Sequence, residues 1–255
     1  MSIIKIYIAK AIAYTALVLG ILSLLWFGLF LYAGSFSLLD FGLGLSGSLW
    51  VNAGLSGLFF AQHSIMVRKW FRARILKIMP EPYYGPFYGI SSALTLLVVL
   101  IAWQETSYML FSAEGYYRVP FRLLFLASLA GLAWGSLTLQ SLDSSGAKNL
   151  LRYAENRPPG TIPLTIQGPY RFVRHPMYFV SLLMIWSCPD ISADKLLFNL
   201  LWSVWIVAGT KLEERDLVED FGDEYQHYQR TVPMLIPWKI RDLPHSLLYN
   251  KGRGL

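Results

Sequence analysis

The segment GPYRFVRHPMY, residues 168–178, gathers cationic and ionisable side chains directly before an apolar run. Proline is favoured at the first position of a helix, so Pro176 is predicted to begin one with His175 as its N-cap. The start of a helix offers backbone N–H groups and partial positive charge, which suit a carboxylate or phosphate. Arg171 and Arg174 would complete an anion site. The alternative is a topology anchor, because basic residues gather at the cytoplasmic ends of membrane helices.

Two adjacent carboxylates, Glu213 and Glu214, follow an apolar run that begins at Leu196. If that helix continues out of the bilayer, it brings them to the same membrane face as Arg174. One carboxylate could then accept hydrogen bonds from ribose hydroxyls or from an ammonium group, while the other pairs with a nearby arginine. The alternative is that both are simply polar residues inside a helix that runs on to Gly222.

Three consecutive polar residues, Gln62, His63 and Ser64, interrupt the second apolar stretch of the chain. Polar side chains within a membrane segment are costly unless they face a cavity or a partner, so they are functional candidates. His63 could act as a base, as a ligand or as a contact between helices. Gln140 and Asp143 are weaker candidates of the same kind.

The elements that must position these groups are membrane helices. Of 255 residues, 55% are hydrophobic and only 15% are charged, with a mean hydropathy of +0.42, whereas soluble chains are typically about 25% charged. The apolar stretches are Ile8–Tyr32, Gly47–Met66, Tyr88–Trp103, Phe121–Leu142, Met177–Cys188 and Leu196–Ala208. The first four approach the span of about 20 residues that a bilayer requires. The last two are shorter and predict a helical hairpin closed by a tight turn at SCPDISAD.

The sequence therefore predicts an all-α, polytopic membrane helix bundle with four spanning helices, a C-terminal hairpin and a cytoplasmic amphiphilic tail. We expect one integral membrane domain over 1–255, with four helices in 1–142 and the connector, hairpin and cofactor-binding part in 143–255. In the tail, Gly222 is expected to end the long helix. Asp223 and Gln226 resemble a capping box for a short helix, DEYQHYQRT.

Charge and cysteine content limit orientation and function. The loops at 67–86 and 143–176 are basic, so the positive-inside rule places them, the N-terminus and the C-terminus in the cytoplasm, and the expected location is an inner membrane. The net charge of +6 is concentrated in such loops and requires no nucleic-acid partner. A single cysteine, Cys188, excludes an intramolecular disulfide and a multi-cysteine metal site, and no metal is expected.

Residues 168–237 resemble the C-terminal signature of the integral-membrane S-adenosylmethionine-dependent methyltransferases, which include isoprenylcysteine carboxyl methyltransferase and the phospholipid N-methyltransferases. The matching motifs are GPYRFVRHPMY, the pair of glutamates in LEERD, and EDFGDEYQHYQRTVPMLIP. QHSIMVRKWF earlier in the chain is similar to the nurim-related branch and, within it, to the bacterial methanethiol S-methyltransferases. Two segments depart from that pattern: MPEPYYGPFYG at 79–89 and LDSSGAKNLLRYAENRPPG at 142–160.

This resemblance implies S-adenosylmethionine as the cofactor. Arg174 and the helix start at Pro176 would hold its carboxylate, and His175 would help to position the amino-acid portion. Glu213 and Glu214 would bind the ribose or the ammonium group. The remaining expected contacts are aromatic: Tyr170 or Tyr178 beside the amino-acid portion, and Tyr225 and Tyr228 over the adenine.

The same resemblance implies a small hydrophobic thiol as the acceptor, methanethiol being converted to dimethyl sulfide, with His63 as the base and Gln62 and Ser64 beside it. Membrane lipid is expected around the chain, and no obligate protein partner is. Alternative acceptors are a prenyl-cysteine carboxylate, a lipid amine or another hydrophobic group. A different class of function is a non-catalytic or haem-associated nurim-like protein, with His63 and His175 as axial ligands.

Overall fold

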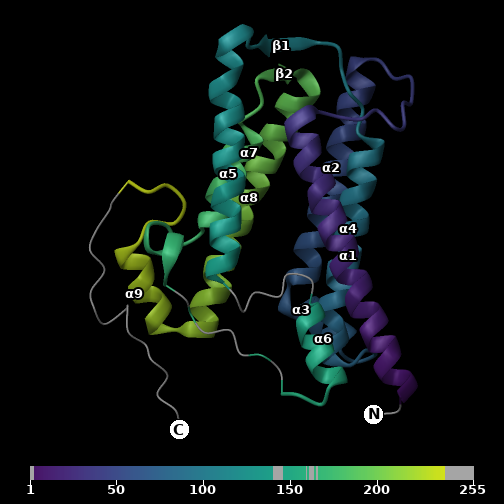
Figure 1. Ribbon diagram of the computed structural model, residues 1–255, viewed down its shortest axis with the longest axis vertical. Helices are drawn as coiled ribbons and strands as arrows, with labels where there is room; N and C mark the ends of the chain where they lie inside the picture. The colour runs from purple at the N-terminus through teal and green to yellow at the C-terminus, as the bar shows by residue number, and fades with distance from the viewer. Residues whose placement is uncertain (1–2, 140–145, 159, 161–163, 165, 239–255) are drawn as a thin grey trace. The chain divides into compact units, whose positions relative to one another are not determined.

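The computed structural model describes residues 3–139, 146–158, 160, 164 and 166–238. Gln140 and Asp143 lie outside these residues. The elements are α1 (Ile3–Ala33), α2 (Leu45–Val67), α3 (Lys69–Ile75), α4 (Glu81–Ala102), β1 (Met109–Ser112), η1 (Gly115–Tyr117), α5 (Arg118–Thr138), α6 (Ala147–Ala154), η2 (Gly168–Arg171), α7 (Pro176–Ile185), β2 (Asp190–Ser192), α8 (Ala193–Phe221) and α9 (Asp223–Thr231) (Figure 1).

Among the described residues, four helical segments are long and apolar enough to cross a membrane by length and composition: Ile3–Ala33, Glu81–Ala102, Gly115–Thr138 and Ala193–Phe221. The predicted all-α membrane bundle is confirmed. One member of the expected four differs. α2 is helical over 23 residues but is not among these four segments, and its buried residues include Ser48, Asn52 and Ser56. α8 takes its place, because the helix continues through its charged half to Phe221, as the sequence analysis expected.

The described residues form two compact units, and α8 contributes to both. The first unit draws on residues 1–113, 143–161 and 190–202. The second draws on residues 114–142, 162–189 and 203–255.

In the first unit, α4 packs against α1, α2 and α6 (Figure 1). Ala9 and Ala13 on α1 are fully buried against Leu150 of α6, and such small side chains let membrane helices approach closely. The tightest approach joins α4 to the residue before α6. There Gly146 has φ +67°, and a Cβ on it would lie 2.3 Å from the backbone of Gly85, so only glycine fits.

Buried polar side chains connect α2, the end of α4 and the start of α8 in the first unit. Asn52 of α2 donates to the Gln104 carbonyl at 2.7 Å and accepts from the Gln104 amide at 2.8 Å. Asp194, at the start of α8, is 1% exposed. It accepts hydrogen bonds from the Trp103 indole at 3.0 Å and from the Thr106 amide and hydroxyl at 3.0 and 2.7 Å. Because donors surround both oxygens, this buried carboxylate is satisfied.

The connection between α7 and α8 differs from the expected tight turn. It contains β2, which pairs antiparallel with β1, with Ser112 opposite Asp190 (Figure 1). The sequence analysis did not predict this two-stranded sheet, because its strands are short and almost 80 residues apart.

The second unit is organised by α5 against α7. A Cβ on Gly131 of α5 would lie 2.8 Å from the Val180 side chain, and one on Gly135 would lie 3.0 Å from Met177. The glycines therefore allow α7 to lie close against α5, and this contact fixes the position of the N-terminus of α7.

Local signals set the ends of the elements in the second unit. Pro176 begins α7 with His175 as N-cap, and α8 ends one residue before Gly222, which has φ +56°. The short helix α9 spans the predicted residues. The expected capping box is wrong, because Gly222 is the N-cap, no side-chain cap bond forms, and Asp223 is already the first helical residue.

Candidate cofactor site

The candidate site forms where the chain enters α7. The Arg174 amide donates to the Pro233 carbonyl at 2.9 Å, and the His175 amide donates to the Met234 carbonyl at 3.0 Å. The segment after α9 therefore pairs with the residues that precede α7. This backbone pairing fixes the positions of the Cα atoms from which the Arg174 and His175 side chains extend.

Glu214 of α8 is the centre of a buried hydrogen-bond cluster. Its Oε1 accepts from Arg174 Nε at 2.9 Å, from His175 Nε2 at 2.6 Å and from the Tyr225 hydroxyl at 2.6 Å. Its Oε2 accepts from Arg174 Nη2 and Gln229 Nε2, both at 2.7 Å. The two-point contact with the guanidinium is the strongest geometry available to an arginine and a carboxylate. Five hydrogen bonds therefore tie α7, α8 and α9 together.

Arg174 donates its hydrogen bonds to groups within the second unit. Besides its two bonds to Glu214, its Nη1 donates to the carbonyls of Gln229, at 2.9 Å, and Val232. The Arg174 and Glu214 side chains are 9% and 10% exposed. The arginine thus crosslinks α8 to the end of α9 with four of its five N–H donors.

The bond to Glu214 also sets the protons of His175. An ionised carboxylate only accepts, so Nε2 of His175 must carry the hydrogen. Nδ1 is then left toward Glu213, whose Oε2 lies 3.9 Å away. The Tyr178 ring stacks on the imidazole at 5.6 Å with an interplanar angle of 14°. The imidazole is therefore held by a hydrogen bond at one edge and by a ring on one face.

Three tyrosine hydroxyls of the site are held in their neutral form. Burial and the hydrogen bond to Glu214 raise the pKa of Tyr225, and burial raises that of Tyr228. Burial and then the nearby Glu213 raise the pKa of Tyr170 to about 12. The Tyr228 hydroxyl donates to the Tyr170 carbonyl. At ordinary pH these groups therefore remain hydrogen-bond donors and add no negative charge.

A cavity of about 300 Å³ opens beside this cluster, a size at the lower end of small-molecule sites. One charged acceptor group, Glu213, reaches it with a side chain that is 42% exposed. The lining residues are Leu139, Leu164, Tyr170, Arg174, His175, Pro176, Met177, Tyr178, Glu213, Leu217, Phe221, Tyr225 and Tyr228. The cavity thus combines aromatic faces, a helix N-terminus and a carboxylate.

The profile of the NnrU protein family matches residues 53–219, well over half of the chain. The chain belongs to the NnrU protein family. The match includes Arg174 and both glutamates, and it ends before the tyrosines of α9.

Several similar proteins carry an enzyme name. The chain is 35% identical over 192 residues to a methanethiol S-methyltransferase of Pseudomonas sp. (strain GM41(2012)), with 73% of this chain and 72% of the relative covered. It is 32% identical over 206 residues to that of Pseudomonas deceptionensis (78% and 76% covered). It is 29% identical over 192 residues to that of Crocosphaera subtropica (75% of each covered). No solved structure matches the chain significantly. The expected resemblance to these bacterial proteins is confirmed, and it supports a methyltransferase.

The structure of this NnrU family member brings all nine sequence-predicted cofactor residues together in the second unit. Eight of them line the cavity, and Glu214 lies behind Arg174. The sequence analysis left open which of the two glutamates pairs with Arg174. In the structure Glu214 pairs with the arginine, and Glu213 faces the cavity. Neighbouring residues on a helix point about 100° apart, which is why one carboxylate is buried and the other exposed.

The sequence analysis missed Gln229, Leu217 and Phe221. Gln229 lies one turn after Tyr225 on α9 and bonds the same carboxylate. Leu217 and Phe221 follow Glu213 at intervals of four residues on α8. The spacing of four was a usable signal in both cases, because such residues share a helix face.

The predicted catalytic residues of this NnrU family member lie in the first unit, on α2. The Tyr88 hydroxyl of α4 lies 2.9 Å from Nε2 and 3.1 Å from Nδ1 of His63. Gln62 Nε2 donates to Ser92 Oγ at 3.3 Å, while the Gln62 Oε1 is buried without a hydrogen-bond partner among the described residues. The Ser64 carbonyl accepts from Arg68. Gln62 and His63 therefore face α4, and Tyr88 and Ser92 are contacts that the sequence analysis did not anticipate.

Proposed function

We propose that this chain is a membrane methyltransferase that binds S-adenosylmethionine in the cavity of the second unit and methylates a small thiol, converting methanethiol to dimethyl sulfide. One observation carries the proposal: eight residues that the methyltransferase resemblance assigns to the cofactor line a single cavity. The enzyme names of the relatives support the reaction class.

The chemistry of the lining fits such a cofactor. The first turn of α7 presents backbone N–H groups and partial positive charge to a carboxylate. Glu213 can accept from an ammonium or from ribose hydroxyls, and the rings of Tyr170 and Tyr178 offer faces that favour a cation. When bound, S-adenosylmethionine supplies a methyl group activated by its sulfonium. The lining residues hold and orient it and exclude water.

Arg174 and Glu214 have a positioning role in this proposal. The bonds within this cluster hold His175 and Tyr225 at the edge of the cavity. The cluster therefore shapes the site, and Glu214 does not contact the ligand. Glu213 is the carboxylate that binds the cofactor directly. This assignment sharpens the sequence-based expectation, which gave both glutamates to the cofactor.

Glu213→Ala is expected to weaken S-adenosylmethionine binding by about 10- to 100-fold, because a hydrogen bond to a charged group is worth about 1.5–3 kcal/mol. Titration calorimetry on the purified chain in detergent measures this. Glu224→Ala, which removes an exposed carboxylate from α9, is the matched control and should leave the affinity unchanged. Equal affinities of wild type and Glu213→Ala would remove Glu213 from the site.

His63 is proposed as the group that takes the proton of the thiol. His63→Ala is expected to preserve cofactor binding and to lower turnover by about 10²- to 10⁴-fold, the usual contribution of a general base. Labelled S-adenosylmethionine and methanethiol, with dimethyl sulfide counted in the headspace, give the rate. Turnover at the wild-type rate would leave His63 as a helix contact with Tyr88.

The acceptor is tested with the same label. Label in a volatile product supports the thiol. Label that appears only in lipid or protein, with none in the headspace, assigns a lipid amine or a prenyl-cysteine carboxylate instead.

A further inference from the structure

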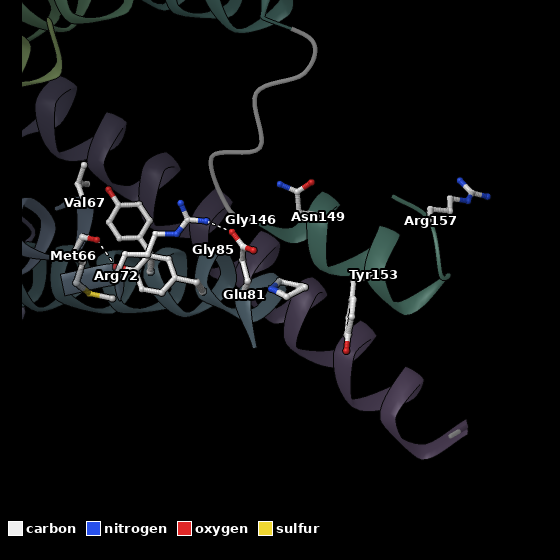
Figure 2. A pocket seen from close by; sticks show the side chains of 12 residues that line it. Met66, Val67, Arg72, Glu81, Gly85, Gly146, Asn149, Tyr153 and Arg157 are labelled. Carbon is white, nitrogen blue, oxygen red and sulfur yellow. Dashed lines mark hydrogen bonds and ion pairs between the residues drawn. The ribbon is translucent and has the colours of Figure 1, made fainter. Parts of the chain in front are cut away.

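A second cavity, of about 440 Å³, lies within the first unit (Figure 2). It forms where α2 ends, α4 begins and α6 crosses them. Its lining residues are Met66, Val67, Arg72, Glu81, Pro82, Tyr84, Gly85, Tyr88, Gly146, Asn149, Tyr153 and Arg157. None of these residues lines the proposed cofactor cavity. Tyr88 also contacts a residue of the proposed function, His63, at 2.9 Å.

The walls of this cavity are fixed by direct contacts between the helices. The Tyr84 hydroxyl donates to the Met66 carbonyl, which ties α4 to the end of α2. The backbones of Gly85 and Gly146 touch, which ties α4 to the start of α6. Because these contacts involve the backbone, the cavity is a built feature of the unit rather than a gap between loose side chains.

An ion pair stands at the polar side of the cavity. Arg72 Nη2 donates to Glu81 Oε1 at 2.6 Å, and Figure 2 shows the guanidinium directed at that carboxylate. The same guanidinium lies 5.8 Å from the centre of the Tyr84 ring. Among the described residues, Glu81 is its hydrogen-bond partner, so Nε and Nη1 of Arg72 can donate to a ligand. Arg157 also lines the cavity, but its Nε pairs with Glu155 Oε2 at 3.3 Å, so Arg72 is the cation on which the site depends.

The cavity also has an apolar lining next to the Arg72–Glu81 ion pair. Met66, Val67, Pro82 and the rings of Tyr84 and Tyr88 supply carbon and thioether surface. A cavity that combines an arginine with apolar surface matches an amphiphile with an anionic head.

The surroundings place the cavity at the height of lipid headgroups. Glu81 is the first residue of α4, one of the helices apolar enough to cross a membrane. The adjoining segment at 68–78 carries Arg68, Lys69, Arg72, Arg74 and Lys77, together with Trp70, 52% exposed, and Ile78, 82% exposed. Basic residues interleaved with an exposed tryptophan are typical of the membrane–water boundary.

We propose that this cavity binds the phosphate headgroup of an anionic phospholipid. Arg72 donates to the phosphate oxygens, and the apolar wall takes the start of the acyl chains. Basic pockets between membrane helices bind such headgroups in general. Glu81 competes with the phosphate for the guanidinium and so limits the affinity.

The test is native mass spectrometry of the full chain in detergent, with phosphatidylglycerol, phosphatidylcholine or inorganic phosphate added. One phosphatidylglycerol is expected to bind in preference to phosphatidylcholine. Arg72→Gln should weaken its binding about fivefold, the usual effect of one basic side chain near an anionic surface. Glu81→Gln should strengthen it by a similar factor. The Arg72 and Glu81 side chains are 49% and 69% exposed, so both variants should fold.

Arg74→Gln is the matched control, because Arg74 is on the same helix but stacks on Trp70 and does not line the cavity. Its phosphatidylglycerol binding should equal that of the wild type. If Arg72→Gln and Arg74→Gln lose the same amount of phosphatidylglycerol affinity, the effect is a general electrostatic attraction between α3 and anionic lipid. That result would overturn the proposal. Equal binding of the two lipids would also overturn it, as would displacement of phosphatidylglycerol by inorganic phosphate.

Discussion

Glu214→Ala is expected to destabilise the second unit by about 3–5 kcal/mol, the usual loss when one partner of a buried ion pair is removed. The substitution leaves the Arg174 guanidinium buried without its carboxylate and removes the acceptor of His175, Tyr225 and Gln229. Three helices then lose their common contact. S-adenosylmethionine binding should be lost as well, because the edge of the cavity is no longer held.

The chain offers its own reporter for this experiment. Its single cysteine, Cys188, is buried within the second unit, so a thiol-reactive fluorophore reports unfolding on heating. Glu214→Ala should react at a clearly lower temperature than the wild type, whereas Glu213→Ala should react at the wild-type temperature. Identical transitions for the two neighbouring glutamates would contradict the division of tasks proposed for them.

Gly146→Ala is expected to cost about 2–5 kcal/mol of stability in the first unit. A left-handed backbone costs a residue with a side chain about 1–2 kcal/mol. The new Cβ would also lie 2.3 Å from the Gly85 backbone, and overpacking adds about 1–3 kcal/mol. The neighbour is main chain, which cannot rotate away as a side chain does. Circular dichroism during titration with a denaturing detergent measures the loss.

Gly42→Ala, in the same unit, separates the two costs. Gly42 also has a positive φ, +63°, but a Cβ there meets nothing within 4 Å. It should therefore lose only the conformational term of about 1–2 kcal/mol. If both alanine variants lose the same stability, the contact between Gly85 and Gly146 contributes nothing measurable.

Local chemistry made much of this fold predictable. Pro176 has no amide hydrogen to lose at the start of α7, and Gly222 tolerates the backbone that ends α8, so both boundaries could be read from single residues. The site residues could be proposed as a set because they belong to one motif, which runs from Tyr170 in η2 to Tyr228 in α9. Their common cavity confirms that they are neighbours, and their individual roles remain proposals.

Other features depend on contacts that no local pattern encodes. Nothing near Glu213 and Glu214 in the sequence says which one turns toward Arg174, because that depends on how α8 is rotated about its axis. The β1–β2 pairing joins segments far apart in the chain. The cavity at Arg72 depends on α6 crossing α4, and its two walls are separated by more than 50 residues of sequence.

The acceptor pattern around Asp194 has a consequence for biosynthesis. Its donors, Trp103 and Thr106, precede it by 91 and 88 residues. At about 5–20 residues per second, a ribosome needs on the order of 5–20 seconds to supply the carboxylate after these donors have been made. The first unit therefore stays incomplete until much of the second has been synthesised. In a nascent chain that stops before Asp190, the Trp103 indole and the Thr106 amide lack this acceptor. Cellular quality control would encounter the protein in that incomplete state.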